Sequence, residues 1–145
     1  GDDPALAEPA FECFFAERQK VDLFDDVLPA LERLASRYPL LALSNGNADI
    51  ARIGLARYFR GSLSAREFGV GKPDPRIFHA ACGRLGQPGA SVLHVGDDPL
   101  LDIAAAHAAG QPSAWVKRPG ALHEKPAQAT HAVENLLQLA DLLGA

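Results

Sequence analysis

The apolar positions of this chain fall into two patterns, short continuous runs and longer stretches with helical spacing. The continuous runs predict buried strands at residues 40–44, 91–95 and 113–117, with a shorter strand at 62–65. The helical spacing predicts helices at residues 5–19, 26–37, 48–59, 75–85, 99–109 and 134–143. Strands that alternate with helices imply βαβ units. We therefore expect an α/β fold, with a Rossmann-like parallel sheet flanked by helices on both faces.

Three carboxylates follow the predicted strand at 91–95. Asp97 and Asp98 stand where the strand ends, and Asp102 lies about one turn into the next helix. Like charges this close together are costly unless a cation neutralises them, and carboxylate oxygens suit a hard ion such as Mg²⁺. The alternative is structural: Asp98 would cap a helix that begins at Pro99, and Asp102 would be solvated.

Two further polar groups belong to the same edge of the predicted sheet. Ser44, Asn45 and Gly46 end the strand at 40–44, where a hydroxyl and backbone N–H groups can hold an anionic oxygen. Lys72 lies in a loop rich in Gly and Pro, from which its ammonium could neutralise a phosphate. The alternatives are an ordinary turn and a solvated surface lysine. Taken together, these groups suit phosphoryl transfer, which depends on charge neutralisation.

Composition narrows the possible partners of the chain. Its 145 residues are 48% hydrophobic and 22% charged, with a net charge of −4 and no run of Lys or Arg, so we expect neither a nucleic-acid nor a membrane partner. Cys13 and Cys82 lack disulfide or metal spacing, which favours a reducing cytoplasm. The chain opens on Gly1 and contains no Met, so we expect it to be the downstream part of a longer, truncated or processed polypeptide.

The order Ser44, Lys72 and Gly96-Asp97 to Asp102 resembles the motif series of the haloacid dehalogenase (HAD) superfamily of hydrolases. The segments around residues 44–48 and 94–98 are most similar to its subgroup of phosphatases that act on FMN and flavin precursors. The resemblance implies Mg²⁺-dependent hydrolysis of a small phosphorylated metabolite, a phosphomonoester, through an aspartyl-phosphate.

The resemblance also implies roles for individual residues. Ser44 and Lys72 would be catalytic and, with Asn45 and Gly46, would bind the substrate phosphoryl group. Asp97 would be the direct metal ligand, and Asp102 would act through water or as a support. Asp98 belongs to the same metal set, with a less defined role.

One departure from the family pattern is large, because no Asp-x-Asp nucleophile motif follows a first strand. Asp22, Asp25 and Asp26 lack the spacing and lead into a helix that Asp25 or Asp26 could cap. We therefore expect residues 21–145 to form a HAD core without its first, central strand, and residues 1–20 to be the last helix of a helical cap. The empty slot would be filled by a missing N-terminal segment, by a strand from another chain through self-association, or by direct pairing of strands 40–44 and 91–95.

The missing nucleophile leaves three functions open. The complete protein would be a phosphatase, and this chain alone would be inactive. A 2-haloacid dehalogenase shares the Ser44-Asn45 and Lys72-Pro73 patterns, although the acidic cluster argues against it. A non-catalytic HAD-like binding domain is the third possibility. The strand position of His94 and the apolar surroundings of Trp115 predict packing roles for both.

Overall fold

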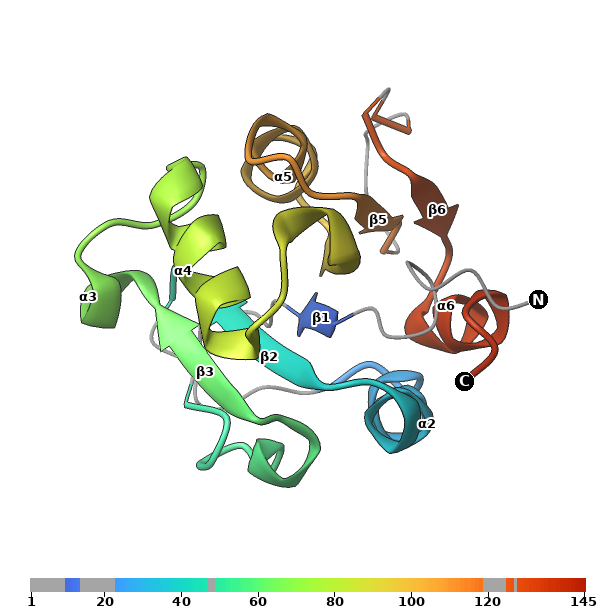
Figure 1. Cartoon of the computed structure of the whole chain (residues 1–145). Coiled ribbons are helices and arrows are strands. Elements are labelled where there is room, and N and C mark those ends of the chain that lie inside the picture. Colours follow the sequence, from blue (N-terminus) through green and yellow to red (C-terminus); the bar gives the residue numbers. More distant parts are fainter. Residues whose placement is uncertain (1–9, 14–22, 47–48, 119–124, 127) are drawn as a thin grey trace.

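The computed structural model describes residues 10–13, 23–46, 49–118, 125–126 and 128–145. The described residues form one parallel sheet in the order β3-β2-β1-β4-β5-β6 (Figure 1). Its strands are β1 (Ala10–Cys13), β2 (Leu40–Ser44), β3 (Gly61–Ser64), β4 (Val92–Gly96), β5 (Ser113–Val116) and β6 (His131–Val133). This arrangement confirms the predicted α/β fold with a Rossmann-like parallel sheet.

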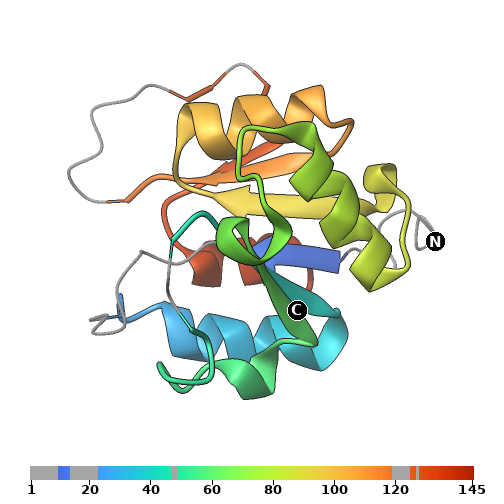
Figure 2. The same cartoon turned by 90° about the vertical axis from the view of Figure 1, so that its left-hand side faces the viewer.

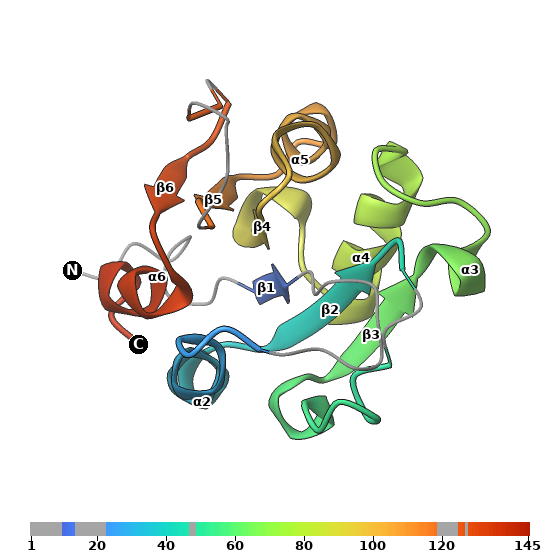
Figure 3. The ribbon, with the colours of Figure 1, turned by 180° about the vertical axis from the view of Figure 1, so that it is seen from behind.

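Helices cover both faces of the sheet, as Figures 2 and 3 show from two directions. On one face, α2 (Val27–Arg37) and α6 (Leu136–Leu142) share a core with Leu40, Leu93 and Val116. On the other face, α4 (Pro75–Leu85) and α5 (Ala105–Ala108) pack on the strand residues Leu41, Leu43, Leu63 and Val92. The shorter elements are η1 (Ala56–Tyr58), α3 (Ala65–Phe68), η2 (Gly89–Ser91) and η3 (Pro99–Ala104). No helix in the described part of the chain is long and apolar enough to cross a membrane.

The central slot of the sheet is occupied by β1, which corrects two expectations. Residues 10–13 pair with β2 on one side and with β4 on the other, so they form a strand where a helix at 5–19 and an absent central strand were predicted. A short apolar run fits a buried strand as well as a helix, and periodicity alone does not separate the two. Pairing decides between them, because an open slot would leave two ladders of backbone groups without partners. The other residues of the predicted cap remnant, 1–9 and 14–20, lie outside the described residues.

Three other features of the structure differ from the predictions: one helix, one strand and one helix cap. The helix predicted over 48–59 is wrong for its described part, which forms turns and the short η1. The third strand of the C-terminal half, β6, was not predicted, because three residues are too few to show an alternating pattern. Asp26 stands at the N-cap position of α2, but its side chain binds Arg118 and the backbone of Leu136.

Candidate active site at the carboxyl edge of the sheet

Two of the predicted site residues, Ser44 and Asp97, lie at the ends of two strands that flank β1 and that finish at the same edge of the sheet. Ser44 is the last residue of β2, and Asp97 directly follows β4. Both strands run parallel to β1, which lies between them. In open α/β sheets, ligands bind beyond the carboxyl ends of the strands. The topology therefore places Ser44 and Asp97 at the edge where such sheets bind ligands.

A buried ion pair joins two loops at this edge. Lys72 Nζ lies 2.5 Å from Asp102 Oδ1, and the two side chains are only 1% and 0% exposed. The structure thus excludes both a solvated surface Lys72 and a solvated Asp102. The two residues are 30 positions apart in sequence, so the pair holds the loop before α4 against η3.

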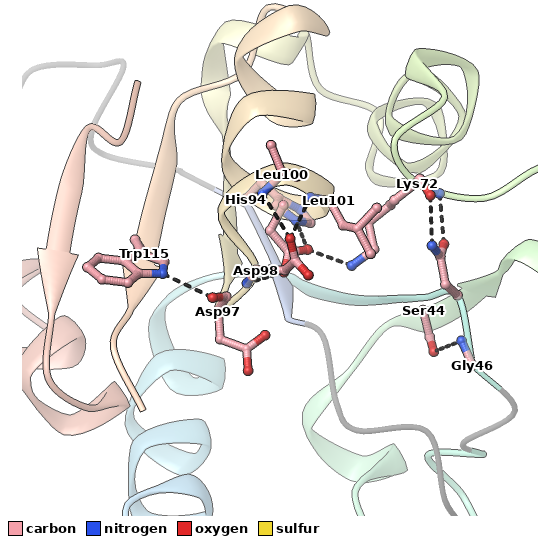
Figure 4. Close-up of polar contacts among 11 residues, drawn as sticks. Ser44, Gly46, Lys72, His94, Asp97, Asp98, Leu100, Leu101 and Trp115 are labelled. Atoms are coloured by element: carbon pink, nitrogen blue, oxygen red, sulfur yellow. Dashed lines mark hydrogen bonds and ion pairs between the residues drawn. The ribbon is translucent and has the colours of Figure 1, made fainter. Parts of the chain in front are cut away.

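Asp102 is held by three donors (Figure 4). His94 Nε2 lies 2.9 Å from the Oδ1 atom that also accepts from Lys72, and the backbone N–H of Asp98 donates to Oδ2 at 3.0 Å. Burial alone would raise the pKa of Asp102. The hydrogen bond and charge of His94, followed by those of Lys72, outweigh burial and hold this pKa well below its usual range. Asp102 is therefore a fixed negative charge beneath the edge.

Asn45 fixes the loop that carries Lys72. The Asn45 amide donates to the carbonyl of Lys72 at 2.8 Å and accepts from its backbone N–H at 2.7 Å. Next to it, the hydroxyl of Ser44 accepts a hydrogen bond from the backbone of Gly46 at 2.9 Å. The turn that was the alternative for these residues is thus present. The two hydrogen bonds of Asn45 link the turn that contains Ser44 to the loop that carries Lys72 (Figure 4).

Asp98 has a structural role, as the alternative for this residue predicted. Its Oδ1 accepts from the backbone N–H groups of Leu100 and Leu101 at 2.8 and 2.9 Å, which caps η3. The first turns of η3 are wide, and Ile103 donates to the carbonyl of Asp98 five residues earlier. This wide turn allows Asp102 to reach back beneath the loop.

Asp97 differs from Asp98 and Asp102. Its backbone carbonyl accepts a hydrogen bond, whereas in Asp98 and Asp102 the carboxylates do so. Trp115 Nε1 donates to the Asp97 carbonyl at 3.0 Å, and Figure 4 shows the Asp97 carboxylate on the side away from His94. Burial raises the pKa of Asp97, the negative charges of Asp102 and Asp98 raise it further, and Lys72 opposes this only in part. The surroundings of Asp97 therefore carry excess negative charge, which a bound cation would compensate.

The three aspartates do not form one ligand group. Within the described ranges, no set of three or more His, Cys, Asp or Glu side chains is arranged to hold a metal ion. Asp102 and Asp98 are engaged by the donors described above, and Asp97 is the member whose charge is least compensated. A single solvent-accessible carboxylate with excess negative charge fits a hard cation that takes further oxygen ligands from water and substrate.

His94 and Trp115 contact the site although their sequence patterns predicted only packing. Both are buried as predicted, but each also positions one aspartate of the loop after β4. His94 and Gly96 are two residues apart in β4 and therefore share one face of the strand. Asp102 packs on Gly96, so the missing side chain at Gly96 is the signal that could have linked His94 to Asp102. Trp115 lies on the neighbouring strand β5 in register with Gly96, which only the strand pairing reveals.

Comparison with known proteins identifies similar chains. Residues 1–110 match the model of the haloacid dehalogenase-like hydrolases. A 5-amino-6-(5-phospho-D-ribitylamino)uracil phosphatase, YigB of Escherichia coli, is 34% identical over 78% of this chain and 48% of its own length. A phosphoserine phosphatase of Thermus thermophilus is 36% identical over 81% of this chain and 50% of its own length. The chain thus spans about half the length of these curated relatives.

Solved structures give a similar result. The crystal structure of a 2-haloacid dehalogenase from Pseudomonas syringae pv. Tomato matches with a TM-score of 0.81 and 39% identity. The match covers 87% of this chain and 55% of the dehalogenase. Similar chains therefore include both phosphatases and dehalogenases.

Proposed function

Because this chain belongs to the haloacid dehalogenase-like hydrolases, we propose that it forms the core of a Mg²⁺-dependent phosphatase that acts on small phosphomonoesters. The observation that carries this proposal is the charge arrangement at the carboxyl edge. A buried Lys72–Asp102 pair lies beside Asp97, a carboxylate whose pKa is raised by burial and by its acidic neighbours. Such an arrangement is suited to a cation and a phosphate together, because each compensates the charge of the other.

Each residue at the edge has a proposed task. Ser44 and Asn45-Gly46 supply a hydroxyl and backbone N–H groups for the phosphoryl oxygens. The Lys72 ammonium, kept in place by Asp102 and Asn45, offsets the negative charge of nucleophile and phosphate. Asp97 would hold Mg²⁺ directly, and Asp98 and Asp102 would support it through the loop. When bound, Mg²⁺ supplies positive charge that stabilises the phosphoryl group during transfer.

The nucleophile of the proposed aspartyl-phosphate route is an aspartate at the carboxyl end of the central strand. The sequence of β1 is Ala-Phe-Glu-Cys and contains no aspartate. Asp26 is engaged by Arg118 and Leu136 near the start of α2, so it does not replace that nucleophile. We therefore propose that the 145-residue chain binds the metal and phosphate but does not turn over substrate. We also propose a cytoplasmic location, supported by the spacing of Cys13 and Cys82, which fits neither a disulfide framework nor a metal site.

A 2-haloacid dehalogenase is the second candidate, favoured by the 39% identity to the Pseudomonas syringae enzyme. That candidate needs no metal, so it gives no reason for the excess negative charge at Asp97. The two functions differ in the ligands that they predict. A phosphatase core binds Mg²⁺ and phosphate together, whereas a dehalogenase core binds a 2-halocarboxylate without a metal.

Isothermal titration calorimetry of the chain with Mg²⁺, in the presence of inorganic phosphate, tests the proposal. Asp97→Asn keeps the shape of the side chain but removes its charge, so we expect Mg²⁺ to bind at least about tenfold more weakly. Asp25→Asn is the matched control, because Asp25 is exposed and its substitution removes the same charge. We expect this control to bind Mg²⁺ like the parent chain.

Two results would overturn the proposal. The metal role of Asp97 is wrong if Asp97→Asn and Asp25→Asn bind Mg²⁺ equally well. The phosphatase assignment is wrong if the chain binds 2-chloropropionate in the presence of a chelator and does not bind Mg²⁺ with inorganic phosphate.

A further inference from the structure

A hollow lies at the amino edge of the sheet, opposite the candidate active site. It has a volume of about 320 Å³ and is formed by the end of α2, the start of β2 and the segment from η1 to β3. Leu40 is the first residue of β2 and Ser44 is the last, so the hollow and the candidate active site are about 13 Å apart along this strand. Figure 3 shows the end of α2 beside the chain that leads into β3. The two sites therefore do not share residues.

The lining of this hollow is basic. Three arginines, Arg37, Arg57 and Arg60, surround it, and no acidic residue is among its lining residues. The whole chain has a net charge of −4, so the lining of the hollow has a charge of opposite sign to that of the chain. Guanidinium groups gathered without carboxylate partners attract oxyanions such as phosphate and carboxylate.

Aromatic rings hold two of these guanidinium groups in place. Arg57 lies 4.7 Å above the ring centroid of Tyr58, and Arg37 lies 6.0 Å from that of Tyr38. Arg37 also donates to the carbonyl of Gly144 at 2.9 Å. These contacts reduce the entropy that the arginines lose when they bind a ligand. Two of the three cations are therefore arranged in advance.

The third arginine is free to complete a site. The Arg60 side chain is exposed and makes no hydrogen bond or ion pair with any residue that the structure describes, while its backbone N–H donates to Leu40 at 2.8 Å. The floor of the hollow consists of buried rings and Leu40, which is 1% exposed. A water molecule takes about 30 Å³ of liquid volume, so the hollow holds roughly ten, about twice the number of heavy atoms in a phosphate ion. It therefore has room for an apolar group attached to the anion.

We propose that this hollow binds a small organic oxyanion, with its phosphate or carboxylate group between Arg37, Arg57 and Arg60 and its apolar body on the floor formed by Tyr38, Leu40 and Tyr58. The volume lies at the lower end of the range for ligand pockets, which suits a ligand the size of a single ring with one charged group. This site is separate from the proposed phosphatase site and does not depend on it.

Nuclear magnetic resonance of the ¹⁵N-labelled chain tests the proposal, because amide shifts report which edge a ligand contacts. The probes are phenyl phosphate, benzoate and the uncharged benzyl alcohol. We expect phenyl phosphate or benzoate, and not benzyl alcohol, to shift the amides of residues 36–40 and 57–60. Shifts at residues 44–46 and 71–72 would report on the candidate active site instead, so the two proposals can fail separately.

Matched charge variants complete the test. Arg60→Gln should weaken binding at the amino edge about fivefold or more, because one charge-assisted contact is lost. Arg66→Gln removes the same charge from the exposed face of α3 and should leave this binding unchanged. The proposal is wrong if neither anion shifts these amides at concentrations up to about 10 mM, because a Kd above this value is weaker than that of ordinary ligand binding. It is also wrong if benzyl alcohol binds as well as the anions, or if Arg60→Gln binds like Arg66→Gln.

Discussion

Substitution of Gly96 by alanine should displace Asp102 and release the ion pair beneath the candidate site. A Cβ atom on Gly96 would overlap the carboxyl group of Asp102 and lie 2.5 Å from its Cβ, where real contacts are far longer. Asp102 is fully buried and cannot move into solvent without leaving Lys72, His94 and the Asp98 N–H. The new methyl group would therefore occupy the space of the Asp102 carboxyl group, and Asp102 would have to give up some of its hydrogen bonds.

The cost of Gly96→Ala follows from these contacts. Overpacking a dense core costs about 1–3 kcal/mol, and each hydrogen bond to a charged group contributes about 1.5–3 kcal/mol. If Asp102 keeps part of its network, we expect the free energy of unfolding to fall by about 3–5 kcal/mol. The typical total for a domain is about 5–15 kcal/mol, so the variant should be markedly less stable but not always unfolded.

Urea unfolding provides the measurement. Trp115 is the chain's only tryptophan and is buried beside Asp97, so its fluorescence reports on this region, and far-ultraviolet circular dichroism reports on the whole fold. Gly83→Ala is the matched control, because a Cβ at this α4 position meets no atom within 4 Å beyond the local backbone of the helix. Alanine within a helix is favoured over glycine by about 0.5–1 kcal/mol, so the control should be neutral or slightly stabilised. The reasoning fails if Gly96→Ala unfolds within about 1 kcal/mol of the parent chain.

Two smaller perturbations test the supports around the site. Trp115→Phe keeps an aromatic ring but leaves the Asp97 carbonyl without its donor. The free energy of unfolding, followed by circular dichroism, should therefore fall by about 1–2 kcal/mol. An unchanged value would show that this hydrogen bond contributes nothing to stability. Asp26→Asn should cost about 1–2 kcal/mol at neutral pH, because the carboxylate binds both Arg118 and the Leu136 N–H. The pKa of Asp26 is lowered, since these bonds outweigh the effect of burial, so its stabilisation is present above the unfolded pKa of about 3.9 and is lost as the pH falls below it. The difference between the parent and Asp26→Asn should therefore shrink between pH 7 and pH 3, and a constant difference would contradict this origin.

The sequence predicted the sheet best where strands are buried on both faces. Continuous apolar runs identified β2, β4 and β5 within a residue or two, because such runs have few alternatives in a parallel sheet. It failed at β1, where a run of apolar residues with aromatic spacing also fits a helix. The deciding information is the pairing with two strands distant in sequence, and local pattern does not contain it.

The site was predicted in part for a similar reason. The positions of Ser44 and Asp97 followed from strand ends, and parallel topology then brought them to one edge. The burial of Lys72 was not predictable, because a lysine in a Gly- and Pro-rich loop is ordinarily solvated. The partner that makes this burial possible lies 30 residues away, and the loop geometry that joins them is fixed by Asn45.

The same contacts explain why glycine precedes Lys72 and Asp97. A Cβ on Gly71 would lie 2.6 Å from Asn45 Oδ1, just as one on Gly96 would overlap Asp102. Neither glycine has a positive φ, so backbone conformation does not require glycine at either position. What requires glycine is a polar side chain that occupies the space where a Cβ would be: Asn45 at Gly71, and Asp102 of η3 at Gly96. Gly71 and Gly96 are therefore packing partners of Asn45 and Asp102. The first lets Asn45 bind the backbone of Lys72, and the second lets Asp102 accept the backbone N–H of Asp98.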